Sequence, residues 1–312
     1  MRSNPKRAVQ GDQVDVIDKL EFLMALARER HFGRAAEACG VTQPTLSAGV
    51  KQLEDTFGVL LVNRGSRFQD FTPEGERVLD WARRIVGDAR SMRQEIHALK
   101  HGLAGRLRLA VVPTALAMVE PLTTPYRARH PEVQFTILSR TSIEILELLE
   151  NLQIDAGLTY LDNEPLGRVT TVPLYRERYR LLVAADSELG DRDEVTWAEV
   201  VRVPLCLLTP DMQNRRIIER LLRDTGIEPN ITLESDSMIL LYSHVRTGRW
   251  ASVMPARLAA TLGLTDVLRS IPIVGFDSSH MIGLVLPARE PMTPLNAALM
   301  AEARRVAATL AD

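Results

Sequence analysis

Residues 41–58 read VTQPTLSAGVKQLEDTFG, and this stretch predicts the second helix of a helix-turn-helix. Thr42 can cap a helix with its side-chain oxygen, and Pro44 stands in the first turn, where a helix tolerates proline. A short helix over 34–39 comes just before, and Gly40 ends it. Two short helices joined by a tight turn that contains glycine are typical of a DNA-reading unit, whose second helix enters the major groove.

The neighbouring segments extend this unit to a winged domain. Upstream, residues 15–30 carry apolar side chains at three- and four-residue spacing, which predicts an amphipathic helix. Downstream, strand-like stretches over 60–63 and 68–71 flank a polar turn and predict a wing. Residues 1–14 have little to bury and are predicted to form a flexible tail. We therefore expect the winged helix-turn-helix domain to span residues 15–72.

A long helix is predicted to follow over residues 73–104, because Thr72, Pro73 and Glu74 provide a cap, a first-turn proline and an early acid. Its apolar residues fall in two columns of seven-residue spacing, three positions apart. Such columns favour pairing with a helix of a second chain, and packing on the helix's own domain is the alternative. The first column is Val78, Ile85, Met92 and Leu99, and the second is Gly75, Ala82, Ala89 and Ile96.

From residue 105 onward strands and helices alternate, so we expect an α/β domain over residues 105–312 with a parallel sheet. Strands are predicted at 107–112, 133–138, 154–158, 179–184, 205–208, 231–233, 251–254 and 282–286. Pro173 and Pro272 suggest crossings between two lobes. Lobe 1 would hold about 105–170 plus 272–312, and lobe 2 about 171–271. Ligands of such folds bind beyond the carboxyl ends of the strands.

Composition limits the class of protein. The 38 basic and 40 acidic residues leave a formal net charge of −2. The chain as a whole is therefore not a strongly basic protein of the kind that binds nucleic acid through overall charge. Residues 1–75 hold ten basic and ten acidic residues, so DNA affinity should depend on a few placed arginines and on two half-sites. No apolar run is long enough to cross a membrane. With two cysteines and no secretory signal, a cytoplasmic protein is expected.

Motifs along the whole chain point to one family. In the first 75 residues these are Ala35-Ala36-Glu37, Val41 to Ser47, Val50 to Glu54, Phe57-Gly58, Arg64 and Phe71 to Gly75, and later Ile154 to Gly157, Val245 to Gly248 and Ser252 to Pro255. Together they resemble the LysR-type transcriptional regulators. The resemblance implies a winged helix-turn-helix, a dimerising linker helix and a two-lobed effector domain similar to periplasmic binding proteins. It also implies control of nearby or divergent operons by a dimer or tetramer on double-stranded DNA with paired half-sites.

Two groups of residues are expected to contact DNA. Gln43, Pro44, Thr45, Ser47 and Lys51 would face the major groove, and Arg34, Arg64 and Arg67 would hold phosphates. Taken alone, each could equally be a solvated surface residue. The chain departs from the family pattern at Gly33, Cys39, Gly49 and Asp70. We expect Gly49 to weaken the helix and to remove a DNA contact.

A second site is expected between the lobes. Thr114 and Ser142 follow predicted strands and open helices, where a hydroxyl and free backbone N–H groups stabilise an anion. A small carboxylate is therefore the expected effector, and the alternative is that both hydroxyls only cap their helices. The resemblance adds Thr209 and Ser237 from the opposite lobe and Thr159 or Tyr160 from the hinge. It extends to members encoded beside formate dehydrogenase genes, which would make formate the signal.

Other classes of function find less support. An enzyme or a solute-binding protein on the two-lobed fold is the alternative, but no nucleophile elbow, phosphate loop or zinc motif occurs, so we expect no catalytic residue, cofactor or metal. His97 and His101 have helical spacing for a metal but lack a third ligand nearby. Peroxide-sensing members of the family pair cysteines inside the effector domain. Here Cys39 and Cys206 fall in different domains, so no disulfide switch is expected.

Overall fold

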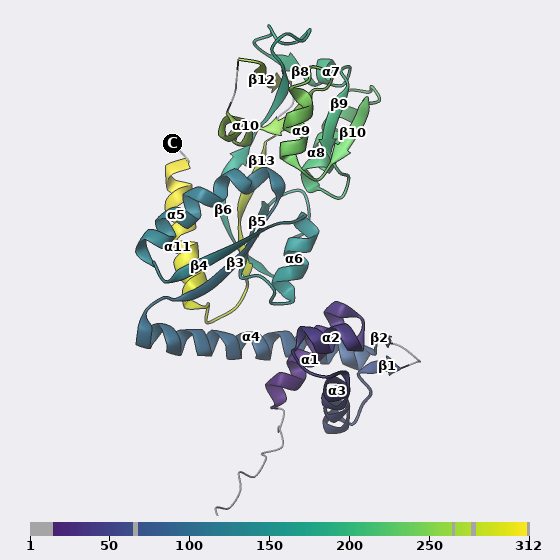
Figure 1. Cartoon of the computed structure of the whole chain (residues 1–312), viewed down its shortest axis with the longest axis vertical. Coiled ribbons are helices and arrows are strands. Elements are labelled where there is room, and N and C mark those ends of the chain that lie inside the picture. Colours follow the sequence, from purple (N-terminus) through teal and green to yellow (C-terminus); the bar gives the residue numbers. More distant parts are fainter. Residues whose placement is uncertain (1–14, 65–67, 264–265, 276–278, 311–312) are drawn as a thin grey trace, which may run out of the picture. The chain divides into compact units, whose positions relative to one another are not determined.

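The structure is a computed structural model that describes residues 15–64, 68–263, 266–275 and 279–310. The chain divides into two compact units, Met1–Arg93 and Gln94–Asp312 (Figure 1). The predicted tail over residues 1–14 and Arg67 lie outside the described residues.

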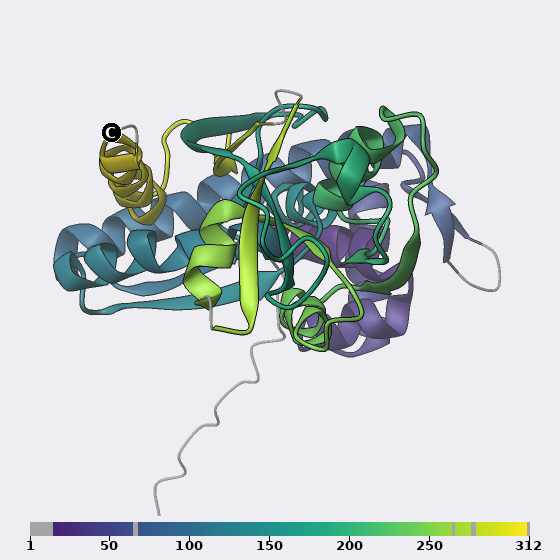
Figure 2. The same cartoon turned by 90° about the horizontal axis from the view of Figure 1, so that it is seen from above.

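The first unit is a helix-turn-helix with a two-stranded wing. Its elements are α1 (Val16–Glu29), α2 (Phe32–Ala38), α3 (Gln43–Phe57), β1 (Val62–Arg64), β2 (Phe68–Phe71) and the first part of α4 (Pro73–His101). Thr42 caps α3 by accepting a hydrogen bond from the backbone N–H of Thr45. Figure 2 shows the β1–β2 hairpin standing out from the helices of this unit.

Two glycines at which the chain departs from the family pattern, Gly33 and Gly49, lie inside helices of this unit. His31 caps α2, because its Nδ1 accepts hydrogen bonds from the backbone N–H groups of Gly33 and Arg34, so Gly33 lies inside the helix. Gly49 is buried, and a Cβ at this position would lie 2.7 Å from the Phe22 ring. Gly49 thus lets α1 and α3 approach closely, and the expectation that it removes a DNA contact is wrong.

The two apolar columns of α4 have different environments. Gly75 and Ala82 are buried in the winged domain, and a Cβ on Gly75 would lie 2.0 Å from the backbone oxygen of Leu61. Ile85, Met92 and Leu99 are 44%, 59% and 78% exposed. The first two residues of one column therefore pack on the winged domain, whereas its last residue, Ile96, is 51% exposed and joins Ile85, Met92 and Leu99 in an exposed apolar face.

The second unit contains two lobes with separate sheets. In lobe 1 the strand order is β4-β3-β5-β13-β6, in which β3 is parallel to β4 and β5. Helices α5 and α11 cover one face and α6 covers the other (Figure 1). The elements of lobe 1 are β3 (Gly105–Val111), η1 (Pro113–Met118), α5 (Val119–Arg129), β4 (Val133–Ser139), α6 (Ser142–Glu150), β5 (Ala156–Tyr160), β6 (Val169–Glu177), β13 (His280–Pro287) and α11 (Pro294–Leu310).

Lobe 2 holds a four-stranded sheet of order β11-β7-β12-β8 and a parallel pair, β10-β9. A bridge between Leu205 and Ala251 joins the two sheets. The elements are β7 (Tyr179–Ala184), β8 (Val195–Thr196), α7 (Trp197–Val200), β9 (Leu205–Leu208), α8 (Gln213–Arg223), β10 (Ile231–Ser235), α9 (Met238–Val245), β11 (Ser252–Pro255), α10 (Ala256–Leu262) and β12 (Leu268–Val274).

The chain passes between the lobes later than the prolines suggested. Pro173 lies inside β6, an edge strand, where a residue without an N–H is tolerated. Pro272 lies inside β12, where pairing passes from β7 to β8. Sheet membership therefore places the crossings directly after Glu177 and between β12 and β13. In the described part of the chain, no helix is long and apolar enough to cross a membrane.

The substitution Gly75→Ala tests the packing of α4 on the winged domain. The added methyl would meet a backbone oxygen that cannot move aside, so we expect a loss of at least about 1–3 kcal/mol of unfolding free energy. Thermal unfolding measures this loss of stability, and a DNA-binding assay shows whether the winged domain still functions. The neighbouring exposed change Glu76→Ala is the control, and equal melting temperatures for the two variants would contradict the close contact.

Candidate functional site

The predicted DNA-reading residues lie on the solvent side of α3. Gln43, Pro44 and Lys51 are exposed, and Thr45 and Ser47 are partly buried. The opposite side of the helix buries Leu46, Val50 and Leu53 in the core of the winged domain. Because the helical period separates these two sets, the polar residues form one accessible stripe.

The three predicted phosphate contacts have different surroundings. Arg34 is exposed on α2, and its guanidinium donates a hydrogen bond of 2.6 Å to the backbone oxygen of Glu29. Its guanidinium is therefore held at the end of α1. Arg64 ends strand β1, but its side chain is outside the described structure, as is the whole of Arg67.

The predicted effector residues of lobe 1 gather at one edge of its sheet. The register pairs Val111 of β3 with Ser139 of β4 and with Leu158 of β5, so these parallel strands end side by side. Thr114 follows β3, Ser142 follows β4, and Thr159 and Tyr160 end β5. The four residues thus meet at the carboxyl edge, where ligands of such sheets bind.

Helix capping does not account for these hydroxyl groups. Thr141, not Ser142, is the N-cap of α6, and it forms a capping box with Glu144. The Ser142 hydroxyl is buried and has no hydrogen-bond partner among the described residues. The Thr114 hydroxyl lies 3.3 Å from the hydroxyl of Tyr160 and caps no helix.

A buried acid that the sequence analysis missed lies beside Tyr160. The Tyr160 hydroxyl donates a hydrogen bond to Oε1 of Glu177 and accepts one of 3.1 Å from Nδ2 of Asn214. Glu177 is the last residue of β6, and Asn214 lies in the first turn of α8. This hydrogen-bond network joins lobe 1, one crossing and lobe 2.

A pattern in the sequence could have indicated this acid. Residues 175–179 read YRERY, in which Tyr175, Glu177 and Tyr179 are buried while Arg176 and Arg178 are exposed. This alternation places the tyrosines and the glutamate on one face of an extended segment. A carboxyl group at an inward position of such a pattern is expected to be hydrogen-bonded or to have a functional role.

Burial raises the pKa of Glu177 to about 7, although hydrogen bonding from Tyr160 and the neighbouring Tyr179, Tyr175 and Asn214 lowers it. Tyr175 and Tyr179 thus lie within hydrogen-bonding reach of the carboxyl group. Burial also raises the pKa of Tyr160 and Tyr179 well above the usual value.

Lobe 2 meets this network through α8. Besides Asn214, Gln213 donates from Nε2 to the backbone oxygen of Asp162 at 3.4 Å. The expected residues Thr209 and Ser237 follow β9 and β10, and Ser237 caps α9. Among the described contacts, neither side chain hydrogen-bonds to Tyr160 or Glu177. Gln213 and Asn214 were not predicted, because only the folded chain brings the start of α8 to the end of β5.

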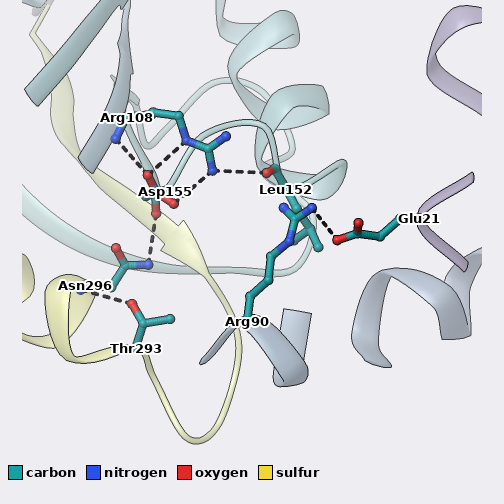
Figure 3. Close-up of polar contacts among 7 residues, drawn as sticks. All are labelled: Glu21, Arg90, Arg108, Leu152, Asp155, Thr293 and Asn296. Carbon is teal, nitrogen blue, oxygen red and sulfur yellow. Dashed lines mark hydrogen bonds and ion pairs between the residues drawn. The ribbon is translucent and has the colours of Figure 1, made fainter. Parts of the chain in front are cut away.

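The motif at residues 154–157 has a structural role (Figure 3). Asp155 Oδ2 accepts a 2.7 Å hydrogen bond from the backbone N–H of Arg108, whose guanidinium also binds the carboxylate. Asn296 donates to the backbone oxygen of Asp155 at 3.0 Å and so ties α11 to the start of β5. Within the first unit, Figure 3 shows Arg90 of α4 paired with Glu21 of α1 at 2.9 Å.

The remaining candidates form no site. His97 and His101 are exposed neighbours on α4, and no group of three or more His, Cys, Asp or Glu side chains suits a metal in the described residues. Cys39 and Cys206 lie in different units as free thiols. Burial raises the pKa of Cys206 to about 11, so this thiol stays protonated and unreactive.

A winged helix-turn-helix followed by a long helix and a two-lobed α/β domain defines a transcriptional regulator that responds to a ligand. The chain belongs to the LysR family. The model described as LysR substrate binding domain matches residues 100–308, and the model for bacterial regulatory helix-turn-helix proteins of the lysR family matches residues 17–76. The protein is therefore a DNA-binding transcriptional regulator with an effector-binding domain, and not an enzyme.

Several relatives resemble the chain along most of its length. The transcriptional dual regulator OxyR of Escherichia coli (strain K12) is 27% identical over 88% of this chain and 90% of its own. The structure of a full-length OxyR variant from Pseudomonas aeruginosa matches with a TM-score of 0.72, 27% identity and coverage of 93% and 99%. CbnR in complex with its target DNA matches in fold with a TM-score of 0.59, 22% identity and coverage of 93% and 99%. These relatives give no support to the association with formate dehydrogenase.

The variant Glu177→Gln tests the raised pKa. The folded chain holds a proton on Glu177 that the unfolded chain releases between about pH 4.5 and 7, so the wild-type unfolding free energy falls as pH rises through this range. The amide of the variant does not titrate. We expect the variant to be more stable than wild type at pH 8, by on the order of 2–3 kcal/mol, and about equally stable near pH 4.5. Melting temperatures at both pH values measure this, and a pH-independent difference would contradict it.

Proposed function

We propose that the regulator reads its operator with the polar stripe of α3. In this proposal Gln43, Thr45 and Ser47 contact base edges with Pro44 and Lys51 beside them, and Arg34, Arg64 and Arg67 hold phosphates. The observation that supports it is the separation of these α3 side chains from the buried face of the helix. The protein would act in the cytoplasm, where chromosomal DNA is accessible, and would control nearby or divergent operons.

We further propose that the protein self-associates through the apolar face of α4. Ile85, Met92, Ile96 and Leu99 are exposed along one helix, and a second copy of α4 would cover them. Dimerisation also supplies the second winged domain that paired half-sites require. Because the winged domain has no net positive charge, two linked domains should bind far more tightly than one.

The effector in this proposal is a small polar metabolite bound between the lobes, with a carboxylate near Thr114 and Ser142. The buried hydroxyls of Ser142 and Thr159 support it, since neither has a hydrogen-bond partner in the part of the chain that the structure describes, as does Tyr160 at the same edge. Thr209 and Ser237 would face the ligand from lobe 2. Several relatives are named hydrogen peroxide-inducible genes activators. Here Cys206 is the only cysteine of the second unit, so we propose reversible ligand binding and no disulfide.

A gel shift with the DNA upstream of its own gene tests this function, with and without a panel of small carboxylates. We expect a retarded complex whose affinity or footprint changes with one of the carboxylates. Failure to bind any such fragment would contradict the proposed operator. Binding that no carboxylate alters would leave the DNA-reading role and remove the proposed effector class.

Single substitutions separate base reading from phosphate binding. Gln43→Ala should cost about 1–3 kcal/mol on the operator and relax the preference for one base pair. Arg64→Ala should weaken binding to all sequences and reduce the salt slope by about one. Fluorescence anisotropy on operator and random DNA over a salt series measures both. Equal losses on the two DNAs for Gln43→Ala would exclude its reading role.

The double substitution Met92→Asp and Leu99→Asp tests the α4 face. Two buried, unpaired charges should dissociate the dimer, because both positions would face a second chain. Sedimentation velocity should show a smaller species, and operator binding should weaken by at least about tenfold. The control Glu95→Asp keeps an acid at an exposed position of the same helix. An unchanged sedimentation coefficient would contradict the proposed interface.

A further inference from the structure

A cavity of about 450 Å³ lies between helix α8 of lobe 2 and two segments of lobe 1. Residues of α8 and its C-cap residue Asp224 line it on one side, and Asn163 after β5 and His280 of β13 line it on the other. Among the described residues, none of those proposed for the effector cleft belongs to this lining. Small-molecule sites commonly measure about 300–1,000 Å³, so the cavity has room for a ligand of its own.

Two cationic side chains at this cavity already have carboxylate partners. Nε and Nη2 of Arg216 donate to the two carboxylate oxygens of Glu164 at 2.7 to 2.9 Å. Nδ1 of His280 lies 3.2 Å from Oδ1 of Asp162. A bidentate pair of this kind uses most of the donors that the guanidinium could offer to a ligand.

Arg220 and Asp224 are the remaining charged side chains of the lining. Both are exposed, and in the part of the chain that the structure describes neither side chain has a hydrogen bond or an ion pair. Glu219, on the same helix, is paired with Arg215 and Arg223 at 3.4 and 2.6 Å. The described lining therefore presents one free cation and one free anion.

The stability of α8 does not explain the acid. Asp224 is the C-cap of the helix, where the helix dipole disfavours a negative charge. Arg220 stands four residues earlier, and a base before an acid is the less favourable order for an ion pair on a helix. The carboxylate of Asp224 thus remains available to a positively charged group from outside the helix.

Two aliphatic residues complete the α8 side of the cavity. Ile217 is 3% exposed, and Leu221 is partly buried. Positions 217, 220, 221 and 224 have the three- and four-residue spacing of one helical face, so these side chains adjoin the two charged groups. A ligand with an aliphatic part would cover them and remove apolar surface from water.

We propose that this cavity is a second ligand site, apart from the effector cleft, for a small zwitterion with an aliphatic part, of the class of an α-amino acid. Arg220 binds its carboxylate, Asp224 binds its ammonium group, and Ile217 and Leu221 contact its aliphatic chain. A ligand with one charge would leave either Arg220 or Asp224 without a partner. Because Asn163 and His280 belong to lobe 1, a ligand held by α8 also contacts the other lobe.

The test uses the full-length chain at pH 7 and three probes with matched carbon chains. These are norleucine, hexanoate, which lacks the ammonium group, and pentylammonium, which lacks the carboxylate. Ligand-observed NMR measures binding, since such small probes bind with dissociation constants of about a millimolar at best. The variants are Arg220→Gln and Asp224→Asn. The matched controls, Arg223→Gln and Glu228→Gln, each remove an exposed charge of the same sign outside the cavity lining.

We expect wild type and both controls to bind norleucine equally. Arg220→Gln and Asp224→Asn should bind it at least about tenfold more weakly, because each variant loses a charge-assisted hydrogen bond. Both residues are exposed, and melting curves check that the variants fold.

Three results would overturn the proposal. Norleucine could fail to bind wild type, or either variant could bind it unchanged. Hexanoate or pentylammonium could also bind as tightly as norleucine with the same dependence on Arg220 and Asp224, which would exclude a zwitterion site. Operator binding, measured by gel shift on the same preparations, reports separately on the proposed function.

Discussion

The architecture of the second unit depends on satisfying a buried carboxyl group. Glu177 ends strand β6 where the chain leaves lobe 1, and it has almost no contact with water. A buried acid needs donors, and Tyr160 supplies one from the end of β5 while Asn214 holds Tyr160 from the start of α8. Tyr160 and Glu177 belong to the sheet of lobe 1, whereas Asn214 comes from a helix of lobe 2. The network therefore fixes how the lobes meet at the edge where strands β3, β4 and β5 end.

In the first unit, the packing of the helices depends on close approach at two glycines. Gly75 lets the start of α4 lie against Leu61 at the base of the wing, and Gly49 lets α3 lie against Phe22 of α1. Larger residues at these positions would push the elements apart. The same helix α4 then presents apolar side chains to solvent over its later turns. One helix thus serves as part of a folded domain and as a surface for a second copy.

Local sequence signals predicted much of the structure. The caps at Thr42 and Thr72, the early prolines and the repeated apolar spacing located helices whose ends agree with the observed ones within a few residues. The hydroxyls at the strand ends were also found, because parallel strands end at one edge. Strands β6 and β12 were missed, since Pro173 and Pro272 contradict strand propensity. Their pairing partners lie more than a hundred and about ninety residues away, respectively.

Local sequence patterns were enough to predict the winged helix-turn-helix, the long helix and the alternating α/β domain, because caps, turns and periodicity act over a few residues. By contrast, the network of Glu177, Asn214 and Tyr160 exists only in the folded chain. These residues lie far apart in the chain, and their electrostatic environment depends on burial by elements from both lobes. Tertiary packing likewise decided which part of α4 is covered, since both columns have the same spacing along the helix, yet Gly75 and Ala82 are buried in the winged domain and Ile96 of the same column is exposed.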